Sequence, residues 1–333
     1  MNTSEPLVEV DGLVKEFTLR RSFRPPLRIR ALNGVSFSIF RGETFALVGE
    51  SGCGKSTLGR TILRIYQPNS GTIRFSGADI TRLSGAALAA YRRRMQIVFQ
   101  DPYASLNPAM QVRDIIAEPL LLKARPSRVR QSRARQSRED CDRQVGDMLV
   151  QVGMSTDDMY KYPHEFSGGQ HQRISIARAL IVRPEFILCD EPISALDVSI
   201  QAHVVNLLED LQQEFGLTYL FVAHDLSMVR HISHRIAVMY MGEIVEIAAT
   251  EEIYRNPLHP YTRALLQAIP VPDPRRARES LPALLEGELP SPLEERQGCA
   301  FFTRCPQARE ACRTHRPRLQ DTGGGHELAC LSP

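Results

Sequence analysis

Nine residues near the N-terminus, Gly49-Glu50-Ser51-Gly52-Cys53-Gly54-Lys55-Ser56-Thr57, have the spacing G-x-x-x-x-G-K-S that is typical of a phosphate-binding loop. Glycines let the backbone turn its N–H groups inward, where they can hold phosphate oxygens. Lys55 can reach the β- and γ-phosphates, and the Ser56 hydroxyl can ligate Mg²⁺. A chance strand-to-helix turn is the alternative. The flanks, apolar Phe45–Val48 before the loop and a helical pattern from Leu58 to Ile65 after it, favour binding of a nucleoside triphosphate.

Two carboxylates, Asp190 and Glu191, end the apolar run Phe186–Cys189. At the carboxyl edge of a parallel sheet they would face the phosphate loop. Asp190 suits a role at Mg²⁺, and Glu191 suits polarisation of the attacking water. The alternative for such a pair is an acidic turn after a strand.

A second anion site is predicted at Ser167-Gly168-Gly169-Gln170, which opens a helical pattern that runs to Leu180. Serine is a preferred N-cap, and two glycines expose backbone N–H groups at the helix N-terminus. Taken alone, this motif indicates helix capping. Two phosphate cradles in one chain indicate that both grip one nucleotide.

The elements that must position these residues predict an α/β fold. Apolar strands at 185–189, 218–223 and 235–239 lack alternation, as in a parallel sheet, and a helix that ends at Gly216 separates the first two. Residues 7–47 are β-rich, with strands at 7–10 and 35–39 and an exposed loop at 20–30; further strands are expected at 71–77 and 96–99 and a helix at 84–94. We expect a P-loop NTPase core with a parallel sheet, an antiparallel β subdomain, a mainly helical region at 110–182 and a small C-terminal extension.

Composition limits the possible functions. The 333 residues carry a net charge of +3, which is too small to indicate nucleic acid. The basic stretch 123–143 could touch lipid headgroups or RNA, but its composition favours a solvated helix-and-loop surface. No apolar run approaches the roughly 18–20 residues that cross a bilayer, and the N-terminus lacks a signal pattern. We therefore expect a cytosolic chain whose membrane role, if any, requires partner chains.

Four of the seven cysteines, Cys299, Cys305, Cys312 and Cys330, cluster near the C-terminus with the spacing C-x5-C-x6-C-x17-C. In a cytosolic protein such a cluster indicates a metal site more than disulfides. The spacing differs from that of a short ferredoxin motif. An iron–sulfur cluster, zinc and free thiols all remain open on the spacing alone.

Together the motifs resemble the nucleotide-binding subunit of an ATP-binding-cassette transporter over roughly residues 7–270. The matching segments are Gly49–Thr57, Gln100, Phe166–Gln170, Asp190-Glu191, Ser194-Ala195-Leu196-Asp197 and His224. Two departures, Phe166 where leucine is commoner and His171 where arginine is frequent, remove no phosphate contact.

The resemblance implies roles for these residues. Glu191, His224 and Gln100 would act in catalysis, His224 and Gln100 at the γ-phosphate. A buried structural histidine is the alternative for His224. Phe17 would stack on adenine, and Asp197 would connect two sites across a dimer. Mg²⁺ would be held by Ser56, Gln100 and Asp190. The residues expected to close over the ATP of the opposite subunit are Ser167, Gly168, Gly169 and Gln170. The residues expected to contact ATP directly are Gly49, Glu50, Ser51, Gly52, Cys53, Gly54, Lys55, Ser56 and Thr57.

A narrower resemblance, to dipeptide, oligopeptide and nickel importers, rests on three stretches. These are Gln100–Pro108, Asn256–Thr262 and the tail Gly298–Cys305. In some of those subunits four cysteines hold a [4Fe–4S] cluster, so the resemblance favours such a cluster here, with zinc as the alternative. Eight prolines between Pro257 and Pro292 indicate a domain boundary near residue 270. We therefore expect a cassette domain at 1–270, with a helical subdomain at about 101–182, and an importer-type extension at 271–333.

The predicted function is an ATPase that powers import of di- or oligopeptides or related solutes. Its predicted partners are a second cassette, two transmembrane permease subunits and, indirectly, an extracytoplasmic solute-binding protein, with no nucleic acid. The chain would be peripheral, on the cytoplasmic face of the membrane. Two alternatives are a soluble cassette ATPase acting on nucleic acid or ribosomes and an ATP-responsive iron–sulfur regulator. Only 66 residues separate Gln100 from Ser167, which leaves no room for the long coiled coil of the first alternative.

Overall fold

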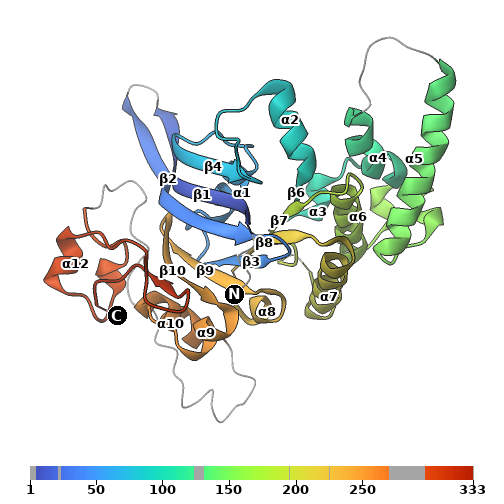
Figure 1. Cartoon of the computed structure of the whole chain (residues 1–333). Coiled ribbons are helices and arrows are strands. Elements are labelled where there is room, and N and C mark those ends of the chain that lie inside the picture. Colours follow the sequence, from blue (N-terminus) through green and yellow to red (C-terminus); the bar gives the residue numbers. More distant parts are fainter. Residues whose placement is uncertain are drawn as a thin grey trace. The chain divides into compact units, whose positions relative to one another are not determined.

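The computed structural model describes residues 5–21, 24–123, 131–194, 196–224, 226–269 and 297–332. The chain divides into two compact units (Figure 1). The first comprises residues 1–83 and 220–333, and the second comprises residues 84–219. The predicted phosphate loop lies in the first unit, and the predicted catalytic carboxylates and signature segment lie in the second.

The first unit contains an antiparallel sheet with the strand order β2-β1-β4-β5. Its strands are β1 (Pro6–Arg21), β2 (Arg24–Phe40), β4 (Ser70–Phe75) and β5 (Ala78–Asp79). The exposed loop predicted at 20–30 is wrong, because β1 and β2 pair as far as Arg21 opposite Arg24. Leu27 and Ile29 alternate with arginines there, as a strand requires. Pro25-Pro26 is tolerated because β2 is an edge strand.

The first unit also contains strands in the order β11-β12-β10-β9-β3. These are β3 (Thr44–Val48), β9 (Arg235–Tyr240), β10 (Glu243–Ala249), β11 (Gln320–Asp321) and β12 (Glu327–Leu328). Strands β3 and β9 are parallel, with Val48 opposite Val238, and the other neighbours are antiparallel. The C-terminal extension therefore adds two short strands to the sheet that carries the phosphate loop.

Helices α1 (Lys55–Ile62), α8 (Leu226–Ile232), α9 (Thr250–Arg255) and α10 (Pro260–Gln267) complete this unit, with α12 (Glu310–Thr314) and the 3₁₀ turn η3 (Phe302–Arg304) in the extension. Strand β8 (Thr218–Ala223) connects the second unit to the first. Both β3 and β8 are buried at every residue, which explains their apolar runs without alternation.

The second unit is built on two parallel strands and a set of helices. Strands β6 (Met95–Val98) and β7 (Phe186–Asp190) pair with Met95 opposite Phe186. The helices are α2 (Gly85–Arg94), α3 (Pro102–Ser105), α4 (Val112–Lys123), α5 (Gln131–Gln151), α6 (Gly168–Leu180) and α7 (Val198–Phe215), with 3₁₀ turns η1 (Thr156–Tyr160) and η2 (Pro163–Glu165). The described part of 110–182 is helical as predicted, and Gly216 ends α7 in the left-handed conformation (φ 63°).

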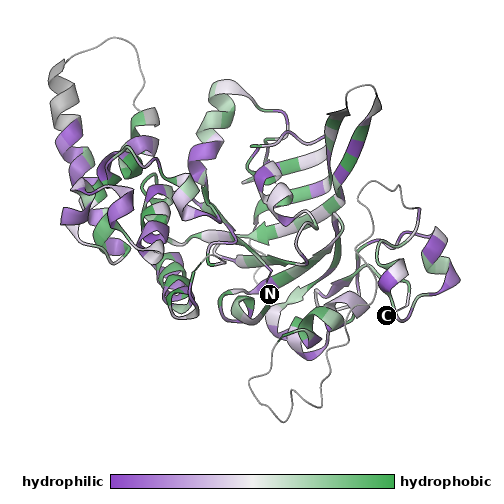
Figure 2. Ribbon diagram, turned by 180° about the vertical axis from the view of Figure 1, so that it is seen from behind, coloured by the Kyte–Doolittle hydropathy of each residue, from purple (hydrophilic) through white to green (hydrophobic). Residues whose placement is uncertain are grey.

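Hydropathy follows these elements. Figure 2 shows the sheet strands mostly in green and much of the long helix α5 in purple. The strands predicted at 71–77, 96–99, 185–189, 218–223 and 235–239, and the helix at 84–94, are confirmed to within a few residues. The strands predicted at 7–10 and 35–39 exist but are parts of the much longer β1 and β2. The predicted boundary near residue 270 lies at the edge of segment 270–296, outside the described residues, and remains a prediction. No described helix is long and apolar enough to cross a membrane.

Candidate nucleotide-binding and catalytic site

The phosphate loop connects β3 to α1, and its glycines are required by close backbone neighbours. A Cβ atom at Gly49 would lie 2.2 Å from the carbonyl oxygen of Met239, and one at Gly54 would lie 2.5 Å from that of Ala31. Gly54 also has a φ of 110°, which other residues rarely adopt. Because both obstacles are backbone atoms, the loop has no room for a side chain at either glycine.

Lys55 is the first residue of α1 and is only 4% exposed. Its Nζ donates to the carbonyl oxygens of Gly49 (2.8 Å) and Glu50 (3.1 Å). The ammonium therefore lies against the loop that would hold the phosphates. Burial raises the pKa of the Cys53 thiol, which keeps this loop residue protonated.

Three later segments of the first unit hold this loop, and no contact with the loop was predicted for any of them. The N–H of Gly242 donates to the carbonyl of Cys53 (2.8 Å), and the N–H of Glu50 donates to the Tyr261 hydroxyl (2.9 Å). The guanidinium of Arg304, in the C-terminal extension, donates twice to the Glu50 carboxylate, at 2.8 and 3.0 Å. Tyr261 falls in the predicted stretch 256–262, but no contact was inferred for it.

Two further predicted residues lie in the first unit. The Phe17 ring meets Tyr66, which follows α1, edge to face at 5.4 Å, and Lys15 Nζ lies 4.9 Å from the Phe17 ring centre. His224 follows β8 and is exposed, so the alternative of a buried structural histidine is wrong. Stacking of Phe17 on adenine and contact of His224 with the γ-phosphate remain predictions.

In the second unit the structure brings Gln100 and Glu191 together. Each follows one of the parallel strands β6 and β7, so both lie at the carboxyl ends of these strands. Gln100 Nε2 donates to Glu191 Oε2 at 2.8 Å. Glu191 has a φ of 49°, a strained value for this residue type that is common at functional sites. Asp190 is fully buried at the end of β7.

The signature segment begins α6, with Ser167 at the N-cap. Gln170 Oε1 accepts from the Ser167 N–H (2.9 Å) and hydroxyl (3.1 Å), which fixes the first turn. A Cβ atom at Gly169 would lie 2.7 Å from Ile200 of α7, so this glycine permits close helix packing. Ser167 to Gln170 thus lie beside the start of α7, where Asp197 is the N-cap.

The segment between Glu191 and Asp197 is held by a residue that sequence reasoning missed. Gln201 Nε2 donates to the carbonyls of Ile193 (3.1 Å) and Leu196 (2.9 Å). A single glutamine on a helix gives no sequence signal for such a role. Ala195 of the predicted Ser194–Asp197 motif lies outside the described residues.

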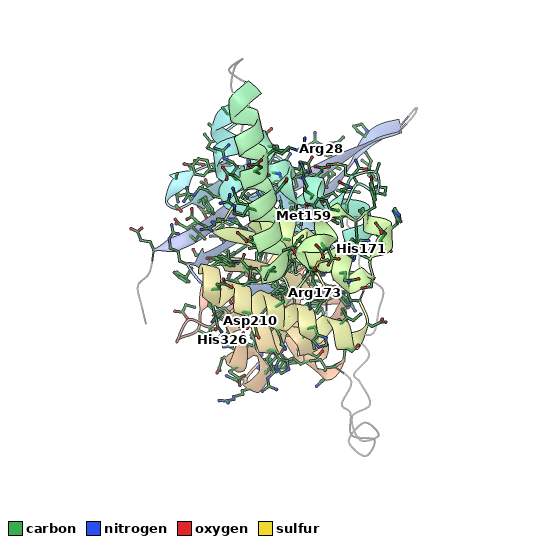
Figure 3. All side chains as sticks on the ribbon, turned by 90° about the vertical axis from the view of Figure 1, so that its right-hand side faces the viewer. Arg28, Met159, His171, Arg173, Asp210 and His326 are labelled. Atoms are coloured by element: carbon green, nitrogen blue, oxygen red, sulfur yellow. The ribbon has the colours of Figure 1, made fainter. Side chains whose placement is uncertain are left out.

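His171, the departure from the family pattern, is buried on α6 near Arg173 (Figure 3). Its Nδ1 lies 2.8 Å from the Ser167 carbonyl oxygen, and its ring lies 4.0 Å from that of Tyr103. Tyr103 is 58% exposed and follows Gln100 by three residues. An aromatic contact therefore links the segment after Gln100 to the signature helix.

The four C-terminal cysteines are close enough to interact. Burial raises the pKa of the Cys299 thiol to about 11, and the nearby Cys312, Cys305 and Cys330 contribute to the rise. The Cys299 N–H donates to the Cys312 carbonyl at 2.8 Å. Within the described ranges, however, no group of three or more His, Cys, Asp or Glu side chains is arranged to hold a metal ion. This arrangement does not support the predicted iron–sulfur or zinc site.

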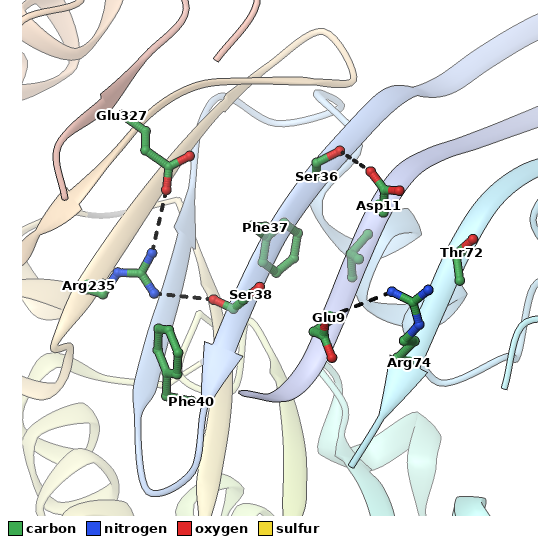
Figure 4. Close-up of a pocket in the computed structure, with 11 residues that line it drawn as sticks. Glu9, Asp11, Ser36, Phe37, Ser38, Phe40, Thr72, Arg74, Arg235 and Glu327 are labelled. Carbon is green, nitrogen blue, oxygen red and sulfur yellow. Dashed lines mark hydrogen bonds and ion pairs between the residues drawn. The ribbon is translucent and has the colours of Figure 1, made fainter. Parts of the chain in front are cut away.

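The predicted Mg²⁺ ligands belong to different units, Ser56 to the first and Gln100 and Asp190 to the second. A pocket of about 460 Å³ in the first unit is lined by none of the predicted site residues (Figure 4). Its two arginines pair with carboxylates of the lining, Arg74 with Glu9 and Arg235 with Glu327, each at 4.0 Å. The third carboxylate of the lining, Asp11, accepts from the Ser36 hydroxyl at 3.4 Å.

Comparison with known proteins agrees with this geometry. Residues 32–194 match the family described as "ABC transporter", and residues 245–312 match "Oligopeptide/dipeptide transporter, C-terminal region". The chain is 47% identical over 329 residues to the oligopeptide transport ATP-binding protein AppF of Bacillus subtilis, covering 98% of this chain and 97% of AppF. It is 46% identical to the oligopeptide transport ATP-binding protein OppF of Salmonella typhimurium, covering 98% and 96%.

Solved structures show the same fold. The ATP-binding cassette MJ0796, in a dimeric post-hydrolysis state bound to ADP and Pi, is 28% identical, with a TM-score of 0.60 over 73% of this chain and 98% of that one. CbiO1 of Clostridium perfringens, part of the ABC transporter complex cbiONQ, is 27% identical, with a TM-score of 0.63 over 76% and 92%. This chain therefore belongs to the ABC transporter family, as an ATP-binding-cassette ATPase. The predicted family and the predicted α/β cassette fold are confirmed.

Proposed function

We propose that this chain is the ATP-hydrolysing subunit that powers import of di- or oligopeptides, or related small solutes, through a separate membrane permease. The observation that carries the proposal is the loop at 49–57, in which two glycines without room for a side chain and a buried lysine form a phosphate cradle. The names of AppF and OppF, oligopeptide transport ATP-binding proteins, support the solute class.

In this function the residues of the two units have separate tasks. The backbone of the loop and Lys55 bind the phosphates, and Phe17 stacks on adenine. Glu191 orients and polarises the attacking water, while Gln100 and His224 respond to the γ-phosphate. Ser56, Gln100 and Asp190 would hold Mg²⁺, which neutralises phosphate charge when bound. The Gln100–Glu191 hydrogen bond keeps the base oriented before substrate arrives.

The working unit contains two cassettes and two permease subunits. Ser167 to Gln170 offer a capped helix N-terminus for the ATP of the second cassette, and Asp197 beside it connects the two sites. The dimeric state of MJ0796 supports this arrangement. The chain lies at the cytoplasmic face of the membrane and meets an extracytoplasmic solute-binding protein only indirectly.

Reconstitution tests the proposal. The chain, co-expressed with its permease subunits and the paired cassette, is placed in proteoliposomes, and ATP hydrolysis and uptake of labelled di- and oligopeptides are measured. We expect uptake that requires ATP and is lost when Glu191→Gln replaces the native chain. Hydrolysis that ignores permease and peptide, together with co-purification of nucleic acid, would instead support a soluble cassette ATPase.

We also propose that Cys299, Cys305, Cys312 and Cys330 hold a [4Fe–4S] cluster that braces the extension. The support is chemical, since four soft thiols in one small extension suit iron–sulfur or zinc, and it does not come from their arrangement, which forms no metal-binding group among the described residues. The extension is too small to build a large core of its own, so a bound group would stabilise it. The test is iron and sulfide analysis of anaerobically purified protein, with the Cys312→Ser variant for comparison. Stoichiometric zinc in the native chain, or a metal content that the substitution leaves unchanged, would refute the cluster.

A further inference from the structure

The C-terminal extension contacts the phosphate loop through one buried arginine. Arg304 forms a bidentate pair with the Glu50 carboxylate, and its side chain is only 6% exposed. Its Nη1 also lies 3.5 Å from the Tyr240 hydroxyl. Bidentate arginine–carboxylate pairs fix orientation as well as providing energy. Glu50 directly follows Gly49, so this contact acts on the loop itself.

The segment that carries Arg304 is rigidly placed. Phe301, three residues earlier and 1% exposed, lies among the rings of Tyr240 (5.2 Å), Tyr261 (5.4 Å) and His259 (5.7 Å). Arg304 ends the turn η3, and its N–H donates to the Phe301 carbonyl at 3.1 Å. The aromatic cluster therefore fixes the position of the turn from which the Arg304 side chain extends to the loop.

Charge gives this pair a consequence for nucleotide binding. Glu50 places a carboxylate inside a loop that must accept a strongly anionic triphosphate. A like charge near bound phosphate disfavours binding, and a partner that neutralises it removes this penalty. Arg304 supplies that partner and at the same time holds the backbone of the loop.

We propose that Arg304 is a positioning residue of the phosphate loop, so that the cysteine-bearing extension sets the affinity of the cassette for ATP. The proposal rests on ATP binding at this loop, which is part of the proposed function. Cys305 follows Arg304 directly, so the first two cysteines, Cys299 and Cys305, flank the residues that contact the loop.

The test measures binding of a fluorescent ATP analogue to the full chain, with KM and kcat for hydrolysis measured alongside. Arg304→Gln should raise the Kd about tenfold, which corresponds to about 1.4 kcal/mol, and KM should rise more than kcat falls. The double variant Glu50→Gln/Arg304→Gln carries no unneutralised carboxylate and should return to within about threefold of the native Kd. A purely structural role for Arg304 does not predict this rescue.

Arg316→Gln is the matched control. Arg316 also joins the extension to the rest of the first unit, but its partners are Glu243 (3.1 Å) of β10 and the Asn33 carbonyl of β2, both outside the loop. The Kd of the Arg316→Gln variant for the ATP analogue should stay within about twofold of that of the native chain. If Arg304→Gln fails to fold, Arg304→Lys, which keeps the charge and loses the bidentate geometry, should raise the Kd by a smaller factor.

Three results would overturn the proposal: native Kd in a folded Arg304→Gln or Arg304→Lys variant, equal loss in Arg316→Gln, or no rescue in the double variant. If the native chain binds no ATP analogue, the proposed function fails instead. The two failures are therefore distinguishable.

Discussion

Gly168 and Gly169, adjacent at the start of α6, should respond differently to alanine. Both have helical backbone, so alanine gains up to about 1 kcal/mol of helix propensity at either position. At Gly168 the new Cβ atom would lie 3.6 Å from Leu196 Cδ2, an ordinary contact. At Gly169 it would lie 2.7 Å from Ile200 Cγ2, which requires the Ile200 side chain or the helix α7 that carries it to shift.

The magnitude follows from the difference between the two positions. Overpacking of this kind costs about 1–3 kcal/mol. Because the propensity gain is common to both variants, Gly169→Ala should have a free energy of unfolding about 1–3 kcal/mol below that of Gly168→Ala. Urea unfolding of the full chain, followed by circular dichroism, measures this difference from the midpoints at a common m-value.

A second substitution identifies the cause. Ile200→Ala removes the Cγ2 atom that meets the new Cβ, so alanine at position 169 should cost little in that background. Equal stability of the two glycine variants, or the same loss with and without Ile200, would show that the packing argument is mistaken.

The same variants separate stability from function. If Ser167 to Gln170 contact the ATP of a second cassette, the Gly168→Ala variant should lose ATP hydrolysis in the assembled transporter. Its midpoint of urea unfolding should nevertheless be at or above that of the native chain. Full activity of Gly168→Ala would indicate that this glycine serves only the helix.

The remaining predictions concern the catalytic base Glu191, the binding of phosphate by Lys55 and the pH dependence of stability. Glu191→Gln should preserve ATP binding and lower turnover at least a hundredfold, measured by steady-state hydrolysis; near-native rates would mean that Glu191 is not the base. Lys55→Ala should raise the Kd for ATP at least tenfold, and unchanged affinity would argue against the cradle. Burial lowers the pKa of His259 from 6.5 to about 4, so its neutral form is favoured in the fold. Stability should therefore be complete above pH 6.5 and fall by about 3 kcal/mol as pH drops toward 4; His259→Asn, which keeps an N-cap acceptor, should flatten this slope in urea titrations, and an unchanged slope would contradict the assignment.

Much of the fold could be predicted because its signals are local. The glycine pattern at 49–57 and the apolar runs that become β3, β7, β8 and β9 each specify a structure within about ten residues. The β1–β2 hairpin was missed because two prolines and several arginines resemble a loop, and only the pairing of β2 at a sheet edge makes a strand there acceptable. Edge position is a property of the whole sheet, which local pattern does not report.

The supports of the site could not be predicted for a related reason. Gln201, Tyr261 and Arg304 act through single hydrogen-bonding groups on residue types that occur throughout the chain. Arg304 lies 254 residues from Glu50, and no periodicity connects them. A motif indicates which residues can bind phosphate, whereas the residues that hold the motif in shape are known only when the chain has folded.

This distinction matters for the phosphate loop in particular. The glycines of the loop allow its backbone angles and its close contacts with neighbouring backbone. They do not by themselves select this conformation over others. Three residues beyond position 240 stabilise this conformation by hydrogen bonds to Cys53 or Glu50. They are Gly242, Tyr261 and Arg304. Two of the three lie in the region that matches the oligopeptide transporter C-terminal region, residues 245–312. The region that matches the oligopeptide transporter C-terminal region therefore also holds the phosphate loop in shape, and nucleotide affinity in this chain should depend on Tyr261 and Arg304.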